Sequence, residues 1–210
     1  GLYVVFTSNR HPDDLYQGGL QREQFLLFSK RLQAEAHTIE LLAATDYRLM
    51  HLRSLETRYY YPLGDGADAF IQHSYDELSN FAVREAGLLT VLGRELKLTA
   101  VHGDVALSSF AELCATPLGP ADYNEIANEF GAVILASIPQ LGPEKRNEAK
   151  RFMLLIDALY EHKVKLVCTA EVAPAELYTQ GDGAFEFQRT VSRLMEMQAE
   201  SYLQSPHNAA

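Results

Sequence analysis

The chain has 210 residues, of which 47% are hydrophobic and 22% are charged, as is typical of a globular protein with one or two domains. Its formal net charge of −10 argues against a general surface for nucleic acid or anionic membrane, because binding to phosphates requires clustered lysine and arginine. No stretch approaches about 18 uninterrupted apolar residues, so the sequence predicts no transmembrane helix.

The first 49 residues read as alternating strands and helices. Residues 2–7 predict a buried strand, which begins with no preceding segment. A short helix is expected from Pro12, because proline suits the first helical position and the acids after it suit the positive end of the helix. A longer helix is expected over 20–35, and a second strand over 37–42.

Residues 50–110 have a different pattern, which favours antiparallel strands. Residues 57–63 are rich in aromatic side chains and predict a strand, and a helix is expected over 67–85. The alternation over 95–110 predicts a hairpin that turns near Gly103. We interpret the whole region as an insertion.

Residues 111–184 again alternate between segments with the apolar spacing of a helix and short apolar runs typical of buried strands. The expected elements are a helix over 120–130, a strand over 132–138, a helix over 146–162 and a strand over 164–169. This order predicts an α/β fold with a largely parallel sheet. A last long helix is expected over 185–203, followed by a disordered tail over 205–210.

Several common sites are missing from the sequence. It contains no Gly-x-x-x-x-Gly-Lys-Ser/Thr phosphate loop, no Gly-x-Gly-x-x-Gly and no Gly-x-Ser-x-Gly. Neither a zinc-type cysteine spacing nor a pair of histidines at helical spacing occurs, so no metal site is predicted. Cys114 and Cys168 both lie in apolar surroundings and are expected to be buried thiols in a reducing compartment.

Polar side chains follow the first strand directly. Thr7, Ser8 and Asn9 come where the apolar run stops, and ligands of α/β nucleotide-binding folds meet the carboxyl ends of parallel strands. The Asn9 amide both donates and accepts hydrogen bonds, which suits the positioning of a water near a γ-phosphate. Alternatively, Asn9 caps the helix that begins near Pro12 or bonds to a loop carbonyl.

Two arginines are spaced one turn apart on the last helix. Arg189 and Arg193 share a face, and like charges at this spacing are mildly destabilising unless an anion or acids compensate. The compensation could come from Glu186 and Glu196 within one turn, or from a nucleotide phosphate.

Motifs along nearly the whole chain resemble AAA+ ATPases of the ZapE type, the AFG-one-like family. The resemblance begins with "VVFTSNRHPDDLYQGGLQREQFLLF" and "TDYR", and it continues with "SFAELCATPLGPADYNEIANEF". It then runs through "EAKRFMLLIDALYEHKVKLVCTAEVAPAELY" and closes with "FEFQRTVSRLMEMQAESYL". The order of several motifs makes it far more specific than any single tripeptide.

The resemblance implies a truncated P-loop NTPase (AAA+) sheet with a family-specific insertion and a C-terminal helical lid segment. The phosphate loop and the Walker B acids, which would hold most of ATP and Mg²⁺, would lie upstream of Gly1. The implied parts are the C-terminal part of the AAA+ core over 1–49, the insertion over 50–110, an α/β unit over 111–184, the lid helix over 185–204 and the tail over 205–210.

The resemblance also implies roles for individual residues. Asn9 matches the sensor-1 position, which orients the hydrolytic water. Arg22 matches an arginine finger that reaches the nucleotide of a neighbouring subunit, although it could instead pair with Glu23 on the helix surface. Arg193, or alternatively Arg189, matches the sensor-2 arginine that contacts bound nucleotide.

A later stretch, "LVCTAEVAPAELY" at 166–178, nearly repeats "VVFTSNRHPDDLY" at 4–16. In the later copy Glu171 stands in the place of Asn9, and Ala136 and Ser137 stand where acids would be needed to hold Mg²⁺. We therefore interpret the later copy as structural, with no second ATP site.

By resemblance, the full-length protein is an ATPase that acts on a protein partner, such as a division-ring protein or an inner-membrane protein, and forms a homo-oligomeric ring. This chain alone is expected to be inactive. The implied location is the cytoplasm, including the periphery of the inner membrane, or alternatively the mitochondrion. An alternative function is a non-catalytic module that docks a partner through the 50–110 insertion, since the run Tyr59-Tyr60-Tyr61 is a composition favoured at interfaces.

Overall fold

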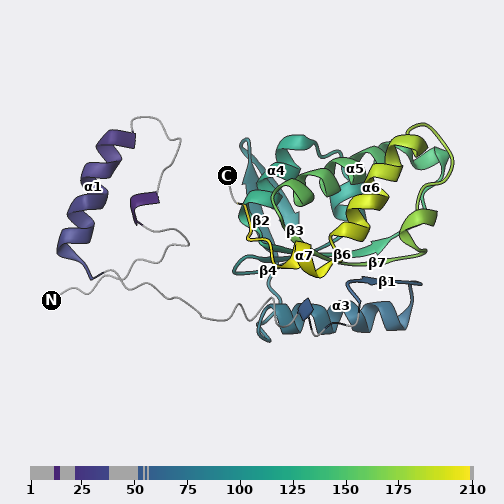
Figure 1. Ribbon diagram of the computed structural model, residues 1–210, viewed down its shortest axis with the longest axis horizontal. Coiled ribbons are helices and arrows are strands. Elements are labelled where there is room, and N and C mark those ends of the chain that lie inside the picture. Colours follow the sequence, from purple (N-terminus) through teal and green to yellow (C-terminus); the bar gives the residue numbers. More distant parts are fainter. Residues whose placement is uncertain (1–11, 15–21, 38–51, 54, 56, 209–210) are drawn as a thin grey trace. The chain divides into compact units, whose positions relative to one another are not determined.

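The chain forms two compact units, Gly1–Ala44 and Thr45–Ala210, in a computed structural model (Figure 1). The structure describes residues 12–14, 22–37, 52–53, 55 and 57–208.

The first unit contains a short 3-10 helix, η1 (Pro12–Asp14), and the helix α1 (Arg22–Glu35). Both were predicted from the sequence. The hydroxyl of Ser29, which is buried, donates to the carbonyl oxygen of Pro12 at 2.8 Å and so ties α1 to η1. The strand expected over 2–7 lies outside the described residues, and so does nearly all of the strand expected over 37–42.

The second unit is built on a five-stranded sheet. Its strands are β1 (Tyr59–Tyr60), β4 (Ala100–His102), β5 (Val105–Ser109), β6 (Ala132–Ile138) and β7 (Lys165–Ala170). In space they follow the order β1-β7-β6-β5-β4, and every neighbouring pair is parallel except β4 with β5. The fold is therefore α/β with a mostly parallel sheet, consistent with a P-loop NTPase-like fold.

Side chains along β6 alternate between two apolar clusters, one on each face of the sheet. Val133 and Leu135 belong to the larger cluster, whereas Ala132 and Ile134 belong to the smaller one. All four are almost fully buried. A strand covered on both faces needs apolar residues at every position, which explains its continuous apolar run in the sequence.

Helices cover the two faces unequally. Figure 1 shows α3 (Asp65–Leu78) on one side of the sheet, and α4 (Pro120–Glu129), α5 (Arg146–Glu161) and α6 (Ala184–Glu196) on the other. Accordingly α3 supplies buried residues to the smaller cluster, and α4, α5 and α6 supply the larger one. The unit thus has three layers, helix, sheet and helices.

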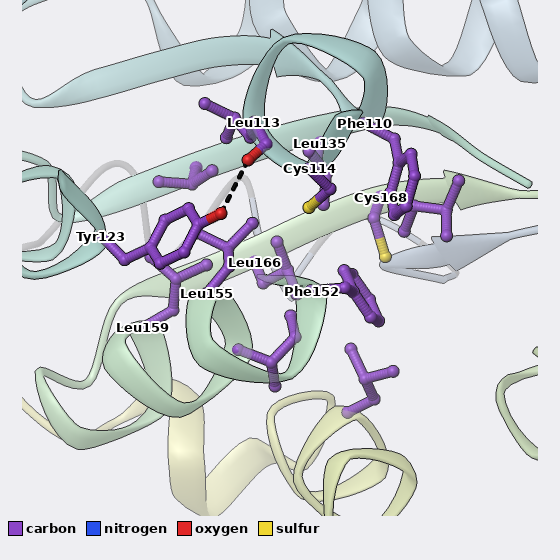
Figure 2. Packing of buried hydrophobic residues seen from close by; sticks show 14 of the residues in the cluster. Phe110, Leu113, Cys114, Tyr123, Leu135, Phe152, Leu155, Leu159, Leu166 and Cys168 are labelled. Atoms are coloured by element: carbon purple, nitrogen blue, oxygen red, sulfur yellow. Dashed lines mark hydrogen bonds between the residues drawn. The ribbon is translucent and has the colours of Figure 1, made fainter. Parts of the chain in front are cut away.

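Contacts between aromatic rings and buried hydrogen bonds of tyrosine hydroxyls, one of them drawn in Figure 2, run through the larger cluster. The ring centroid of Phe152 lies 5.9 Å from that of Phe110 and 6.0 Å from that of Phe187. The Tyr123 hydroxyl donates to the carbonyl oxygen of Leu113 at 2.8 Å. Cys114 and Cys168 are both buried and unpaired as predicted, and burial raises the pKa of each thiol.

The region 50–110 is not separate from the α/β unit that follows it. Its residues supply β1, β4 and β5 to the same sheet as β6 and β7. Among the described strands, only the hairpin of β2 (Gly87–Val91) and β3 (Arg94–Leu98) forms a sheet of its own. The expected boundary near residue 110 therefore falls inside one sheet. The strand expected over 57–63 and the hairpin expected over 95–110 are present as β1 and as β4 with β5, but their pairing with β7 and β6 has no local sequence signal.

The helix expected over 67–85 ends early, at Leu78. Asn80 and Phe81 have φ angles of 55° and 60°, in the left-handed region that stops an α-helix.

The long last helix is also interrupted. After α6 the chain passes through Ala199 in an extended conformation before α7 (Glu200–Leu203) begins.

The described part of the tail is packed rather than disordered. His207 Nε2 lies 2.7 Å from the carbonyl oxygen of Ala127, and the Asn208 amide donates to the carbonyl oxygen of His162 at 2.8 Å. The Lys165 ammonium also donates to the carbonyl oxygens of Tyr202 and Ser205. These backbone partners could not be read from the tail's polar composition.

Candidate functional site

The carboxyl ends of β5, β6 and β7 meet at one edge of the sheet because the three strands are parallel. In open α/β sheets this is the edge where ligands bind. The polar groups at this edge come from the turn after β5, from the last residues of β6 and from the loop after β7.

After β5 the chain forms a single π-helical turn, η2 (Ala111–Ala115), which begins with a reciprocal cap. The Glu112 carboxylate accepts from the Ser109 amide at 2.8 Å, while the Glu112 amide donates to the Ser109 hydroxyl. The hydroxyls of Ser108 and Thr99 also donate to this carboxylate, each at 2.7 Å. Burial acts to raise the pKa of Glu112, but these hydrogen bonds outweigh it and leave the pKa below its usual value. Glu112 is therefore an ionised anchor of the turn.

The end of β6 has an irregular backbone. The register with β7 shifts between Leu135 and Ile138, and Ser137 has a φ angle of 62°. The Ser137 amide donates to the Thr169 hydroxyl at 2.9 Å, and the Glu171 carboxylate accepts from the Gln140 amide at 2.8 Å. The polar groups here thus join β6 to β7. A pocket of about 220 Å³ opens beside them, lined by Phe110, Ala111, Ala115, Ser137, Pro139, Lys145 and Glu148.

The two arginines of α6 meet a shared acid on α5. One oxygen of Asp157 pairs with Arg193 and the other lies 3.4 Å from Arg189. The Arg193 guanidinium also lies over the ring of Tyr160, 4.8 Å from its centroid, and 3.8 Å from Glu161. The side chain of Arg193 is 13% exposed and that of Arg189 is 63% exposed. Burial lowers the pKa of Arg193, but a guanidinium remains a cation at neutral pH.

Arg22 is the first residue of α1 in the first unit. Its Nη2 donates to the carbonyl oxygen of Asp13 at 2.8 Å, so α1 and η1 together fix the guanidinium. Within the described ranges, no acceptor bonds its buried Nε and no carboxylate forms an ion pair with it, Glu23 included. Arg22 is therefore a half-buried cation with unused donors.

Asn9 lies outside the described residues. The structure therefore brings together Arg189 and Arg193, places Arg22 in the other unit, and gives no position for Asn9. In the part of the chain that the structure describes, no three His, Cys, Asp or Glu side chains converge to hold a metal ion. Among the same residues, no helix is long and apolar enough to cross a membrane.

Comparison with known proteins decides the family. The AFG1-like ATPase family matches residues 1–206. The chain belongs to this family. Among curated proteins, it is 36% identical to the cell division protein ZapE of Escherichia coli K12, over all of this chain and 56% of that protein. It is 34% identical to lactation elevated protein 1 homolog B of Danio rerio, over 96% of this chain and 47% of that protein.

A third relative, the uncharacterized protein C115.02c of Schizosaccharomyces pombe, is 30% identical over 98% of this chain and 52% of its own length. The chain thus spans about half the length of the curated relatives it matches. No solved structure matches it. Membership of this family connects the chain to an AAA+ ATPase role.

Sequence reasoning missed Asp157, the residue that organises the arginine pair. A signal was present, because Asp157 is an acid one residue after Ile156 of the apolar stripe on α5. One of the expected local acids, Glu196, also contributes: its carboxylate accepts a hydrogen bond from the Tyr160 hydroxyl at 2.7 Å, and its charge acts to raise the pKa of Arg193 against the effect of burial. The cap of η2 was also readable, since Ser109 and Glu112 have the Ser-x-x-Glu spacing of a capping box.

Proposed function

We propose that this chain takes part in ATP hydrolysis by a ring-forming AAA+ protein, which couples the hydrolysis to remodelling or regulation of a protein partner. The observation that carries the proposal is the match of the AFG1-like ATPase family to residues 1–206. The similarity to ZapE, named as a cell division protein, supports a division-ring protein as the partner in a bacterium. An inner-membrane protein is the alternative partner that the family resemblance implies.

Arg22 is proposed as the arginine finger. A finger must present a guanidinium that is fixed in direction and not neutralised, so that it can stabilise negative charge on the transferring phosphoryl group. The hydrogen bond to Asp13 supplies the fixed direction, and the absence of an ion pair among the described residues leaves the charge available. In a closed ring with head-to-tail interfaces, this arginine would act on the nucleotide of the neighbouring subunit.

Asn9 is proposed to orient the attacking water within its own subunit. Its amide can accept from the water and donate to a phosphate oxygen at once. The bound Mg²⁺ supplies neutralisation of the phosphate charge. Its ligands and the phosphate loop would come from residues other than these 210, as the greater length of the relatives allows.

Of the two α6 arginines, Arg189 has the geometry that better suits contact with a nucleotide phosphate. Arg193 is mostly buried and is held by Asp157 and Tyr160, so reaching a phosphate would require it to break these contacts. Arg189 shares only the second oxygen of Asp157 and remains largely exposed. We therefore propose Arg189 as the sensor-2 arginine, with Arg193 as its neighbour in the fold.

The first experiment compares two arginines of the same helix in the full-length protein. Arg22→Ala is expected to lower ATP turnover by about 10³-fold or more while leaving MgATP affinity unchanged. Arg31→Ala is the matched control, because Arg31 is 79% exposed and pairs only with Glu35 on its own helix. Unchanged turnover in the Arg22 variant would remove the finger assignment, and a wild-type protein without ATPase activity would remove the proposed function.

Mixing two inactive variants tests whether the finger acts between subunits. Asn9→Ala subunits keep Arg22, and Arg22→Ala subunits keep Asn9. In randomly mixed rings, about one interface in four combines an intact asparagine with an intact neighbouring arginine, so turnover should recover to about a quarter of wild type. No recovery in rings shown to be mixed would place both residues in the same subunit's site.

A second function is favoured by one observation in the 50–110 region. Exposed apolar side chains gather in its sequence between residues 81 and 92, where Phe81 is 70%, Val83 78% and Leu92 83% exposed. Of the tyrosine run, Tyr59 is buried and Tyr60 stacks on Phe70, whereas Tyr61 is 51% exposed and could join such a surface. A docking module would bind a partner protein through these residues without nucleotide. Loss of partner binding on Phe81→Ser, with ATP turnover unchanged, would support this role.

A further inference from the structure

Two stretches of the chain have similar sequences, and the described part of each contains the same short turn. Residues 7–16 read "TSNRHPDDLY", and residues 169–178 read "TAEVAPAELY". In each, the proline opens a three-residue 3-10 helix, η1 in the first and η4 (Pro174–Glu176) in the second. The second stretch begins with the last two residues of β7, so its turn lies at the carboxyl edge of the five-stranded sheet.

The same sheet also has the connections of a nucleotide-binding fold. The chain leaves β1 for α3, which packs on the smaller cluster, and leaves β7 for α6, which packs on the larger one. In such sheets, a crevice forms where two neighbouring parallel strands are followed by helices on opposite faces. Ligands bind in this crevice. A nucleotide here would lie between the ends of β1 and β7, with its phosphates on the first turn of α3.

The first turn of α3 does not fit a phosphate. The connection after β1, residues 61–66, contains no lysine or arginine, and the turn itself begins with Asp65 and Asp68. The phenol of Tyr60 lies so close to Gly66 that a methyl group added there would overlap its hydroxyl. Tyr60 is held in this place by stacking on Phe70, with centroids 5.2 Å apart. Carboxylates and a phenol therefore occupy the place where a phosphate would need cations and bare amides.

The ends of β6 and β7 do not fit magnesium or an attacking water. Ala136 and Ser137 offer no carboxylate where Mg²⁺ would need one. The side chains of Thr169 and Glu171 already accept the amides of Ser137 and Gln140. Glu171, at the position that corresponds to Asn9, thus joins two strand ends.

We propose that the sheet of residues 59–178 is a nucleotide-binding fold that binds no nucleotide, and that each chain contributes to a single ATP site, the one that contains Asn9. The number of ATP sites per chain, one, rests on the proposed function. The exclusion of nucleotide from the crevice rests instead on the carboxylates and the phenol that occupy it. The sheet's role is then to carry α6 and the loops around it.

The test uses the full-length protein and a non-hydrolysable ATP analogue with Mg²⁺. Calorimetric titration should give one analogue bound per chain. A photoreactive azido-ATP should label no peptide from residues 59–78, which form the β1 and α3 side of the crevice. Two analogues per chain, or labelled peptides within 59–78, would overturn the inference. If no analogue binds, the proposed function and the single ATP site per chain are both wrong. The exclusion of nucleotide from the crevice would still hold.

Variants at the crevice add an independent readout. Replacing both acids of the α3 turn, Asp65→Asn with Asp68→Asn, should change analogue affinity by less than about twofold, since neither acid is near a nucleotide. An affinity change of about tenfold or more in the folded variant would show that nucleotide does reach this turn. The unfolding temperature of the variant, measured alongside, verifies that it is folded.

Discussion

Each unit of the molecule contains a proline-led 3-10 turn and a helix arginine with restricted solvent access, and the two units hold these features differently. In the first unit, polar side chains from α1 hold η1: Ser29 bonds the carbonyl of Pro12, and Arg22 bonds that of Asp13. In the second unit, η4 is held by the core, and its neighbours Leu177 and Tyr178 are almost fully buried. Arg193, on α6 of the same unit, is paired with Asp157 on α5.

Under the proposed function, the difference would let one local conformation serve chemistry in one unit and stability in the other. Arg22 is oriented by a neutral carbonyl, as the proposed arginine finger requires. Arg193 is neutralised by a carboxylate and packed on an aromatic ring, so its charge is used inside the fold. A cation that must stabilise a transition state is oriented best by neutral partners.

The largest effect in this comparison is expected at the second turn. Leu177→Ala removes a side chain that is 0% exposed and should lower the free energy of unfolding by about 2–5 kcal/mol. Urea denaturation followed by circular dichroism measures this loss. A cost well below about 1 kcal/mol would mean that η4 is no more embedded than η1.

The next effect is expected at the arginine pair. Asp157→Asn leaves Arg193 buried without its charged partner and should cost about 2 kcal/mol of stability, as for a hydrogen bond to a charged group. In a double-mutant cycle, Asp157 should couple strongly to Arg193 and only weakly to the exposed Arg189. Equal coupling to both arginines would contradict the division of roles between them.

A smaller effect is expected at the first turn. Ser29→Ala removes the hydroxyl that bonds Pro12 and should cost about 1 kcal/mol. If η1 serves catalysis, the same variant should lower ATP turnover in the full-length protein by misplacing Arg22, more than it lowers MgATP affinity. A loss of stability with full turnover would separate the turn from the chemistry.

The smallest effect is a pH dependence at the carboxyl edge. Hydrogen bonds hold the pKa of Glu112 below its usual value, so folding favours the ionised form. The stabilisation is complete above the unfolded-state pKa of about 4.3 and is lost as the pH falls through the lower folded-state pKa. Glu112→Gln should flatten this part of the stability curve. An equally steep curve in the variant would assign the dependence to other carboxylates.

The sequence predicted most elements well and their long-range pairing poorly. The apolar run of β6 and the stripe of α5 are strong signals because each is set by burial along many residues. The strand predicted over 57–63 is reduced to the two residues of β1, and their pairing with Cys168 and Thr169 depends on residues far away in the chain.

For the candidate site, the sequence indicated which residues to consider but not their partners in the fold. Arg189 and Arg193 could be recognised from their spacing, but their shared partner Asp157 lies on another helix and is found only through tertiary packing. That Arg22 would bond a backbone carbonyl rather than Glu23 also depends on how α1 meets η1. The role of Asn9 stays a prediction.

A reciprocal exchange between the two stretches tests the central claim most directly. In the full-length protein, Asn9→Glu places in the first stretch the residue of the second, and Glu171→Asn does the reverse. We predict that Asn9→Glu abolishes ATP turnover and that Glu171→Asn leaves it unchanged while lowering the unfolding temperature. Loss of turnover in Glu171→Asn with the fold intact, or full turnover in Asn9→Glu, would contradict the claim.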